Sequence, residues 1–425
     1  MKIDYCGGKM NELQKIFTMR TVPCKFGVGA TQEVGFEVKK INAQHVLIVC
    51  DQTISKQTNI LEKIIGIIEG EGIDVQVWDK VEPEPTTISI QKAIDSIEDS
   101  DFDCLVGIGG GSTISTSKII NLYCSYPKDF HAFFPSPLGK SRHIPGRIKP
   151  LIVLPTTAGT GSEASAVANI SVLDESGNRR KAAISSEYLL PDLAILDPIN
   201  TVTMPPQLTA SSGLDALLIA IGVYTAKPFY TNTRTLTSKQ ESEYIGSNPF
   251  SDLFAEKAIE LCSKYIRRVY ANGFDIEARE GMLFASHLAG IAAGKAGTHI
   301  PHANAISIGE KVQADAGIRV AVTSPACFDF IAPFLPGRMK HIAELLSGET
   351  GNTLKESQFR ASHFLIALLK DLKCPNGISE LGLGEKDIPE LSERAFQEKR
   401  LLAQTPRFIT RENIEEIFRA SLKNW

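Results

Sequence analysis

The sequence predicts an α/β amino-terminal domain with a mostly parallel sheet, followed by an all-helical carboxyl-terminal domain. Three observations predict this fold class. Short β-branched runs alternate with helical patterns in the first half, one strand leads into three consecutive glycines, and the pattern beyond about residue 204 is helical. We therefore expect an α/β domain over residues 1–204, a helical domain over 205–425, and a cleft between them.

The predicted sheet rests on five apolar runs, at residues 45–51, 75–81, 104–109, 150–157 and 192–197. Continuous runs of this length are typical of strands buried on both faces, as in a parallel sheet. Between them, residues 59–72 and 86–99 have helical spacing, and Ser89 is a candidate N-cap of the second helix.

Helical patterns follow the break at "MPPQL" (204–208). The predicted helices span 251–271, with Ser251 as a candidate N-cap, 276–296, 354–371 and 411–423. The polar stretch 232–248 interrupts them and predicts a surface loop. Loops of this length are either functional or disordered.

The composition argues against nucleic-acid and membrane partners. The chain has 45 Lys and Arg against 49 Asp and Glu, so its net charge is −4 and no basic excess is available. No apolar run approaches the roughly 18 residues of a membrane span, and the first residues lack the apolar core of a signal peptide. Eight cysteines lie scattered without a C-x-x-C pair, which is typical of a reducing compartment. We therefore expect a cytoplasmic protein.

The stretch "CLVGIGGGSTISTSK" (104–118) carries the strongest local pattern. A strand leads into Gly109, Gly110 and Gly111, and Ser112 then opens a helix that carries Lys118. Glycines let the backbone approach a ligand closely, and a helix N-terminus presents free N–H groups to an anion. The stretch therefore predicts a pyrophosphate site in a dinucleotide-binding domain. The alternative is a tight strand–helix turn with no ligand, because Ser112 stands where the Rossmann fingerprint has its third glycine.

Two further strand ends bear polar groups. Asp51 ends the strand 45–51, where a carboxylate can accept hydrogen bonds from a ribose diol, or simply cap a loop. "PTTAGTGSE" (155–163) is a second Gly/Thr-rich turn that can line a nucleotide.

Together these stretches resemble the iron-containing (group III) alcohol dehydrogenases, whose relatives include glycerol dehydrogenase and dehydroquinate synthase. The resemblance covers nearly the whole chain, including "GVGA", "RKAAIS", "PDLAILDP", "MPPQLTASSGLDAL" and "ASHLAGIAAGKAG" in the family's order. It implies NAD(P)H in the cleft and hydride transfer between an alcohol and a carbonyl. It also implies a homodimer or a larger homo-oligomer.

The resemblance assigns cofactor contacts position by position. Asp51 matches the ribose carboxylate, which favours NAD(H) over NADP(H). The remaining matches are the pyrophosphate loop, the second loop and two lysines: Gly109, Gly110, Gly111 and Ser112; Thr156, Thr157 and Thr160; Lys118 and Lys181. Ser115 stands where the family has an Asp.

The family's metal site is incomplete in this sequence. Family members hold Fe²⁺ or Zn²⁺ with one Asp and three His. Asp215 and His302 match two of these positions, whereas Ile219 and Ala316 stand at the other two. Ile306 replaces a further family histidine near the substrate. A rival alignment makes His302 the last ligand, but it also leaves only two donors.

Two protein donors are fewer than a catalytic zinc usually has. We therefore expect no catalytic metal. A rearranged site using His299 and Asp315 is the alternative.

Without a metal, hydride transfer needs a proton-transfer group and fixed donors around the reacting oxygen. His302 is the candidate, with Asp215 orienting its ring and His299 in reserve. Lys295, Lys311 or Arg319 is expected to bind a substrate carboxylate. The alternative is that His302 is a hydrogen-bonded core residue and the lysines are surface charges.

The sequence thus predicts a metal-independent, NAD(H)-dependent oxidoreductase that interconverts an alcohol and a carbonyl. One alternative is oxidation of a β-hydroxy acid with decarboxylation, for example of a peptide's carboxyl-terminal threonine, with the 232–248 loop accommodating a peptide or carrier-bound substrate. A second is a catalytically inactive, nucleotide-binding pseudo-dehydrogenase.

Overall fold

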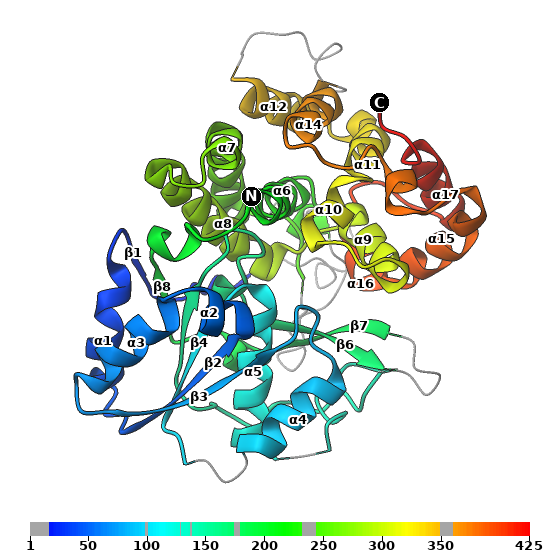
Figure 1. The fold of residues 1–425 in the computed structure, drawn as a ribbon. Coiled ribbons are helices and arrows are strands. Elements are labelled where there is room, and N and C mark those ends of the chain that lie inside the picture. The colour runs from blue at the N-terminus through cyan, green and yellow to red at the C-terminus, as the bar shows by residue number, and fades with distance from the viewer. Residues whose placement is uncertain are drawn as a thin grey trace, which may run out of the picture.

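The computed structural model describes residues 17–97, 101–127, 129–136, 138–173, 179–231, 244–348 and 360–425. Most of the predicted loop 232–248 and the start of the predicted helix 354–371 lie outside these residues. Figure 1 shows an α/β layer with a group of helices packed beside it.

The α/β part is built on a six-stranded sheet in the order β1-β8-β5-β4-β2-β3, and all its paired strands are parallel. The strands are β1 (Cys24–Phe26), β2 (His45–Asp51), β3 (Asp74–Val81), β4 (Cys104–Gly109), β5 (Leu151–Pro155) and β8 (Leu193–Leu196). All five predicted strands are present, which confirms the fold class. The edge strand β1 was not predicted, because three residues show no apolar run.

Helices cover both faces of this sheet (Figure 1). Ile48 and Val106 pack with α1 (Val34–Lys40) and α3 (Ile60–Glu69) on one face. Leu47 and Leu105 pack with α4 (Thr87–Ile97) and α5 (Gly111–Ser125) on the other. Neighbouring residues of a strand point to opposite faces, so a strand covered on both sides must be apolar throughout.

A short helix and a hairpin complete the α/β part. Helix α2 (Gln52–Gln57) follows β2, and the antiparallel hairpin is formed by β6 (Val167–Leu173) and β7 (Arg179–Ser185). The hairpin was not predicted, because β7 begins with three basic residues. It carries Lys181 toward the helical part.

The rest of the chain is helical. The helices are α6 (Pro206–Tyr224), α7 (Pro249–Ala271), α8 (Ile276–Ala296), α9 (Ile300–Lys311), α10 (Ala316–Ala321), α11 (Ser324–Ile331), α12 (Pro336–Ser347), α14 (Arg360–Asp371), α15 (Ile388–Gln397), α16 (Lys399–Leu402) and α17 (Arg411–Ala420). The change from strand to helix falls between Leu196 and Pro206, around the proposed boundary at 204.

Helix α6 is long and apolar enough to span a membrane by length and composition, contrary to the expectation that no segment approaches this. However, 89% of its most apolar window is buried inside the protein, as in the central helix of a core.

Both serine cap candidates lie three residues inside their helices. The N-cap of α4 is Thr86, whose hydroxyl accepts from the Ser89 N–H, while the Ser89 hydroxyl accepts from the Thr86 N–H. Asn248 and Ser251 form the same reciprocal box at the start of α7. The two serines therefore stabilise these helix starts from the third helical position rather than from the cap.

Candidate active site

The order of the strands indicates where a ligand binds. From the adjacent strands β2 and β4 the chain proceeds in opposite directions, to β3 on one side and to β5 on the other. Ligands of open parallel sheets bind beyond the carboxyl ends of the strands at such a switch point. Asp51 ends β2 and Gly109 ends β4, so both lie at this point.

The glycine loop has no space for side chains. Gly109 has φ +157°, and a Cβ added to it would lie 2.3 Å from Thr113 Oγ1. A Cβ on Gly111 would lie 2.6 Å from Thr160 Oγ1. Helix α5 begins at Gly111, one residue before the predicted start at Ser112, with Gly110 as its N-cap. The loop thus presents bare backbone and a helix N-terminus, which fits a pyrophosphate group.

The Ser112 side chain contacts a segment outside this loop. Its hydroxyl donates to the carbonyl oxygen of Pro83, in the segment that follows β3. A ligand at the helix N-terminus would therefore meet the Ser112 backbone N–H, with the side chain turned to Pro83.

The structure brings the predicted second loop against the first. A Cβ on Gly110 would lie 3.1 Å from Thr157 Oγ1, and the Thr156 N–H donates to the Gly109 carbonyl at 3.1 Å. The Thr160 and Ser162 hydroxyls lie 2.7 Å apart. Three hydroxyl groups and the glycine backbone therefore line one site at the carboxyl ends of the central strands.

Lys118 supports this site through hydrogen bonds to the backbone. It is fully buried, and its Nζ donates to the carbonyl oxygens of Ser162, Ser165 and Val167 at 2.8, 2.7 and 3.0 Å. Burial lowers the pKa of Lys118 to about 7, against a raising effect of Glu163. With three hydrogen bonds to backbone carbonyls, Lys118 holds the second loop against the start of β6, and the direct cofactor contact expected for it stays a prediction.

Asp51 acts as a helix cap in this structure. Its Oδ1 accepts from the N–H groups of Thr53 and Ile54 at 2.8 and 3.0 Å, at the start of α2. The capping alternative is therefore realised. Because both bonds end on Oδ1, a ribose contact through the other oxygen stays a prediction.

A charge cluster that the sequence did not predict joins the two parts of the chain. Glu84 pairs with Lys181 of β7 at 3.2 Å and with Arg319 of α10 at 3.0 Å. Burial raises the pKa of Glu84, but the two cations outweigh it, so that pKa is lowered. Burial lowers the pKa of Lys181. The only sequence indication of Glu84 was its place just after a parallel strand.

Arg319 is buried and only partly paired. Its Nη2 contacts Glu84, whereas Nε and Nη1 are buried without a hydrogen-bond partner. Its guanidinium lies against α9, since a Cβ on Gly309 would be 1.8 Å from Nη1. Burial raises the pKa of Asp215 to about 6, and the nearby Arg319 charge lowers it. Arg319 therefore presents free N–H donors in a buried site between Glu84 and Asp215.

The three cationic side chains predicted to bind a substrate carboxylate differ in the contacts that they already make. Lys311 pairs with Asp387 and Glu390 at 3.0 and 2.6 Å, so its charge is satisfied within the helical part. The Lys295 backbone carbonyl accepts from Ile245, and its side chain is half-buried. Of the three, Arg319 is the one whose buried donors lack partners.

The predicted reacting histidines occupy different surroundings. Both ring nitrogens of His302 are buried without a partner, so no hydrogen bond to Asp215 orients the ring. Burial lowers the pKa of His302 to about 4. His299 is fully buried and shares a 2.8 Å hydrogen bond with the Thr225 hydroxyl. Burial, with a contribution from His302, lowers the pKa of His299 to about 3. His299 is therefore held in the core by its hydrogen bond to Thr225, whereas both ring nitrogens of His302 are free to contact a ligand.

The residues at the family's metal positions do not fit a metal ion. Asp215 and His302 can donate, but Ile219 and Ala316 have no donor atom. In the part of the chain that the structure describes, no group of three or more His, Cys, Asp or Glu side chains is placed to hold one. The rearranged alternative is not assembled either, because His299 is fully buried and Asp315 is exposed.

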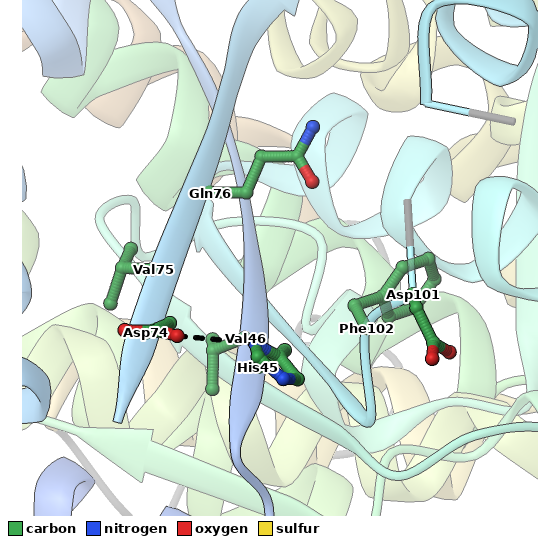
Figure 2. Close-up of a pocket in the computed structure, with 7 residues that line it drawn as sticks. All are labelled: His45, Val46, Asp74, Val75, Gln76, Asp101 and Phe102. Carbon is green, nitrogen blue, oxygen red and sulfur yellow. Dashed lines mark ion pairs between the residues drawn. The ribbon is translucent and has the colours of Figure 1, made fainter. Parts of the chain in front are cut away.

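A pocket of about 260 Å³ lies at the opposite end of the sheet (Figure 2). His45 and Asp74, the first residues of β2 and β3, line it together with Asp101 and Phe102. Since cofactors of such sheets bind at the carboxyl ends of the strands, this pocket is separate from the candidate active site.

Comparisons with known proteins agree with this geometry. The model of the iron-containing alcohol dehydrogenases matches residues 23–198, and the model of the carboxyl-terminal part of the Fe-containing alcohol dehydrogenase family matches residues 243–422. The mitochondrial hydroxyacid-oxoacid transhydrogenase of Bos taurus is 34% identical over 423 residues, covering 96% of this chain and 90% of the relative. The probable mitochondrial hydroxyacid-oxoacid transhydrogenase of Dictyostelium discoideum is 32% identical, covering 94% and 77%.

Solved structures share the fold. A 1,3-propanediol oxidoreductase superposes with a TM-score of 0.86 at 27% identity, covering 96% of this chain and all of the other. A sulfoacetaldehyde reductase from Bifidobacterium kashiwanohense, solved in complex with NAD+, has a TM-score of 0.81 at 23% identity, covering 96% and 98%.

The relatives contradict the expected cytoplasmic location. Relatives that span 94–96% of this chain are named as mitochondrial proteins, so the expectation of a cytoplasmic location is overturned. Scattered cysteines indicate a reducing compartment, but they do not distinguish one reducing compartment from another.

Proposed function

The chain belongs to the iron-containing alcohol dehydrogenase family and is an NAD-linked oxidoreductase of alcohols and carbonyls. We propose that it acts on hydroxy acids without a resident catalytic metal. The observation that carries this proposal is Arg319, whose Nε and Nη1 are buried and unpaired. A carboxylate is one of the groups that a planar guanidinium binds well. The names of the curated relatives, hydroxyacid-oxoacid transhydrogenases, support the same substrate class.

The cofactor site supports the use of NAD(H). The bare backbone of Gly109–Gly111 and the hydroxyls of Thr157 and Thr160 would hold the pyrophosphate, and Asp51 disfavours a 2′-phosphate. Once bound, the nicotinamide supplies the hydride acceptor or donor.

The chain's own residues supply binding and proton transfer. Arg319 would anchor the substrate carboxylate beside Gly309. His302 and Gly309 lie seven residues, about two helical turns, apart on one face of α9, so His302 borders the same side of this helix as the Arg319 guanidinium. A free ring nitrogen of His302 takes the hydroxyl proton as the carbonyl forms.

The test compares hydroxy acids with their uncharged amides. Titration of the purified protein with NADH and NADPH, followed by fluorescence, should give tighter binding of NADH. Turnover is then measured on α-, β- and γ-hydroxy acids and on the matching amides, before and after treatment with a chelator. We expect turnover of acids alone, and no loss after chelation.

Two outcomes would overturn parts of the proposal. If the amides were turned over as fast as the hydroxy acids, the proposal that a substrate carboxylate is required would be wrong. Activity that requires one Fe or Zn per chain, measured by elemental mass spectrometry, would remove the metal-independent mechanism.

The alternatives are separated by the products. Release of CO₂ with the carbonyl product would identify oxidative decarboxylation, which a peptide or carrier-bound β-hydroxy acid would show most clearly. NADH binding without any turnover would identify a nucleotide-binding pseudo-dehydrogenase. His302→Ala is expected to keep NADH binding and to remove turnover, and full turnover would assign proton transfer to another group.

A further inference from the structure

A short proline-rich segment connects the glycine loop with the buried arginine of the candidate active site. This Pro-Glu-Pro segment, residues 83–85, lies between the end of β3 at Val81 and the start of α4 at Thr87. Proline fixes its own φ and restricts the residue before it to extended conformations, so Glu84 has little backbone freedom. The segment is therefore stiff.

The backbone of the segment is attached to the glycine loop at one end and to the hairpin at the other. The Ser112 hydroxyl, at the start of α5, donates to the Pro83 carbonyl oxygen. The Ser171 N–H of β6 donates to the Pro85 carbonyl oxygen at 2.8 Å. Ser171 lies opposite Lys181 in the register of the hairpin, so backbone and side-chain contacts with the hairpin fall at one cross-strand pair.

The Glu84 side chain divides its two oxygens between the two parts of the chain. Oε2 lies 3.2 Å from Lys181 Nζ in the α/β part, and Oε1 lies 3.0 Å from Arg319 Nη2 in the helical part. Within the described residues, Glu84 is the one ion-pair partner of Arg319, whose Nε and Nη1 have no hydrogen-bond partner. Glu84 is therefore the contact that fixes the direction of this guanidinium.

We propose that Glu84 is a positioning residue that directs the Arg319 guanidinium toward the substrate carboxylate, and that the Pro-Glu-Pro segment ties this position to the glycine loop. The inference rests on the proposed binding of a hydroxy acid by Arg319. The contacts that carry it run from Ser112 to Pro83 and from Glu84 to Arg319.

This arrangement makes cofactor binding and acid binding depend on each other. A cofactor that fixes the start of α5 also fixes the segment and the guanidinium, so less conformational entropy is lost when the acid binds. NAD(H) and the acid should therefore strengthen each other's binding, by the same factor in both directions.

The sign of the effect on KM separates positioning from charge. By Coulomb's law alone, removal of the Glu84 carboxylate would favour a substrate carboxylate at Arg319 and lower the KM. Loss of positioning acts in the opposite direction, and we expect Glu84→Ala to raise the KM for hydroxy acids by about fivefold or more. Glu82→Ala removes the same charge at an exposed residue two positions earlier, and this matched control should leave the KM unchanged.

The decisive measurement is the coupling between NADH and a hydroxy acid. NADH is titrated by fluorescence into the full-length protein, with and without saturating 2-, 3- or 4-hydroxybutyrate. No hydride is transferred, because NADH and the hydroxy acid are both already reduced. In the parent protein we expect the acid that is turned over to tighten NADH binding by about fivefold or more, and its amide to have no effect.

Variants at both ends of the connection test it. Glu84→Ala and Ser112→Ala should each bring the ratio of the two NADH dissociation constants close to one, whereas Glu82→Ala should keep the parent ratio. A change in NADH affinity alone cancels in this ratio, so a purely structural role of either residue would not change it. Glu84→Gln retains an acceptor for one of the two cations and should retain part of the ratio.

Two results would overturn the inference and leave the proposed function intact. One is turnover of the acid with a parent ratio of one, and the other is the parent ratio in a folded Glu84→Ala protein. If Glu84→Ala does not fold, Ser112→Ala and Glu84→Gln decide instead. If no hydroxybutyrate is turned over or changes NADH binding, the proposed function fails, and this inference fails with it.

Discussion

At the scale of single residues, the structure distinguishes side chains that appear equivalent in the sequence, because their contacts differ. Lys311 and Arg319 were both candidates for a substrate carboxylate. Lys311 already contacts two carboxylates, whereas Arg319 contacts one and keeps two buried nitrogens unpaired. A buried donor without a partner is costly, which makes Arg319 the stronger candidate of the two for a substrate carboxylate.

This contrast gives the first prediction. Arg319→Met should raise the KM for hydroxy acids by about 30-fold or more, because truncating one partner of a buried charge pair costs about 2–5 kcal/mol. Steady-state kinetics with saturating NAD⁺ measures it. Lys311→Met is the matched control and should leave the KM unchanged. An unchanged KM in Arg319→Met, with NADH binding intact, would assign the carboxylate to another group.

Asp215 gives the second prediction, in which the sign is informative. Burial raises its pKa to about 6 in the folded protein, so stability falls as the pH rises from the ordinary Asp pKa of about 4 to about 6, where the unfolded chain is ionised before the folded one. Asp215→Asn should therefore match the parent protein near pH 4 and become more stable by up to about 3 kcal/mol at pH 7. Urea unfolding across this range measures the difference. A bound metal at Asp215 would give the opposite sign at pH 7.

At the scale of elements, the start of α5 and the second cofactor loop form one unit. Lys118 of α5 holds one carbonyl of the second loop and two carbonyls of the segment that leads into β6, and the glycines of the strand–helix turn leave space for the loop's hydroxyls. The loop is thus positioned by the same helix whose N-terminus would bind the pyrophosphate.

The third prediction tests the glycine turn. Gly110→Asp should abolish NADH binding, because its Cβ would lie 3.1 Å from Thr157 Oγ1 and its carboxylate would repel the pyrophosphate. Fluorescence titration with NADH measures this. The control is Gly66→Ala in α3, where an added Cβ meets nothing within 4 Å. This control should keep NADH binding and gain roughly 1 kcal/mol in the free energy of unfolding.

The fourth prediction concerns the support of the loop. Lys118→Met should lower the free energy of unfolding by about 2–4 kcal/mol, because buried carbonyls lose a charged donor. It should also weaken NADH binding. Thermal and urea unfolding measure the first effect, and Lys92→Met, at an exposed lysine of α4, is the control. Equal stability of the two variants would show that the carbonyls find other donors.

At the scale of the whole molecule, the candidate active site draws its residues from both the α/β part and the helical part. Glu84 and Lys181 come from the α/β part, and Arg319, Asp215 and His302 come from the helical part. The ion pair of Glu84 with Arg319 joins the two across this boundary. The expected homodimer or larger assembly stays a prediction, which the mass in solution would check.

The amino-acid sequence was enough to predict the layered α/β fold and the glycine turn, and its resemblance to the family places Ile219 and Ala316 at two expected metal positions. Strands buried on both faces must be apolar throughout, and neither Ile219 nor Ala316 can donate in any fold. Only the packed structure shows that Lys118 supports the second loop, that Glu84 meets Arg319, and that Glu163 meets His287. Sequence periodicity reports which face of an element is buried, whereas contacts between residues hundreds of positions apart depend on how the elements pack.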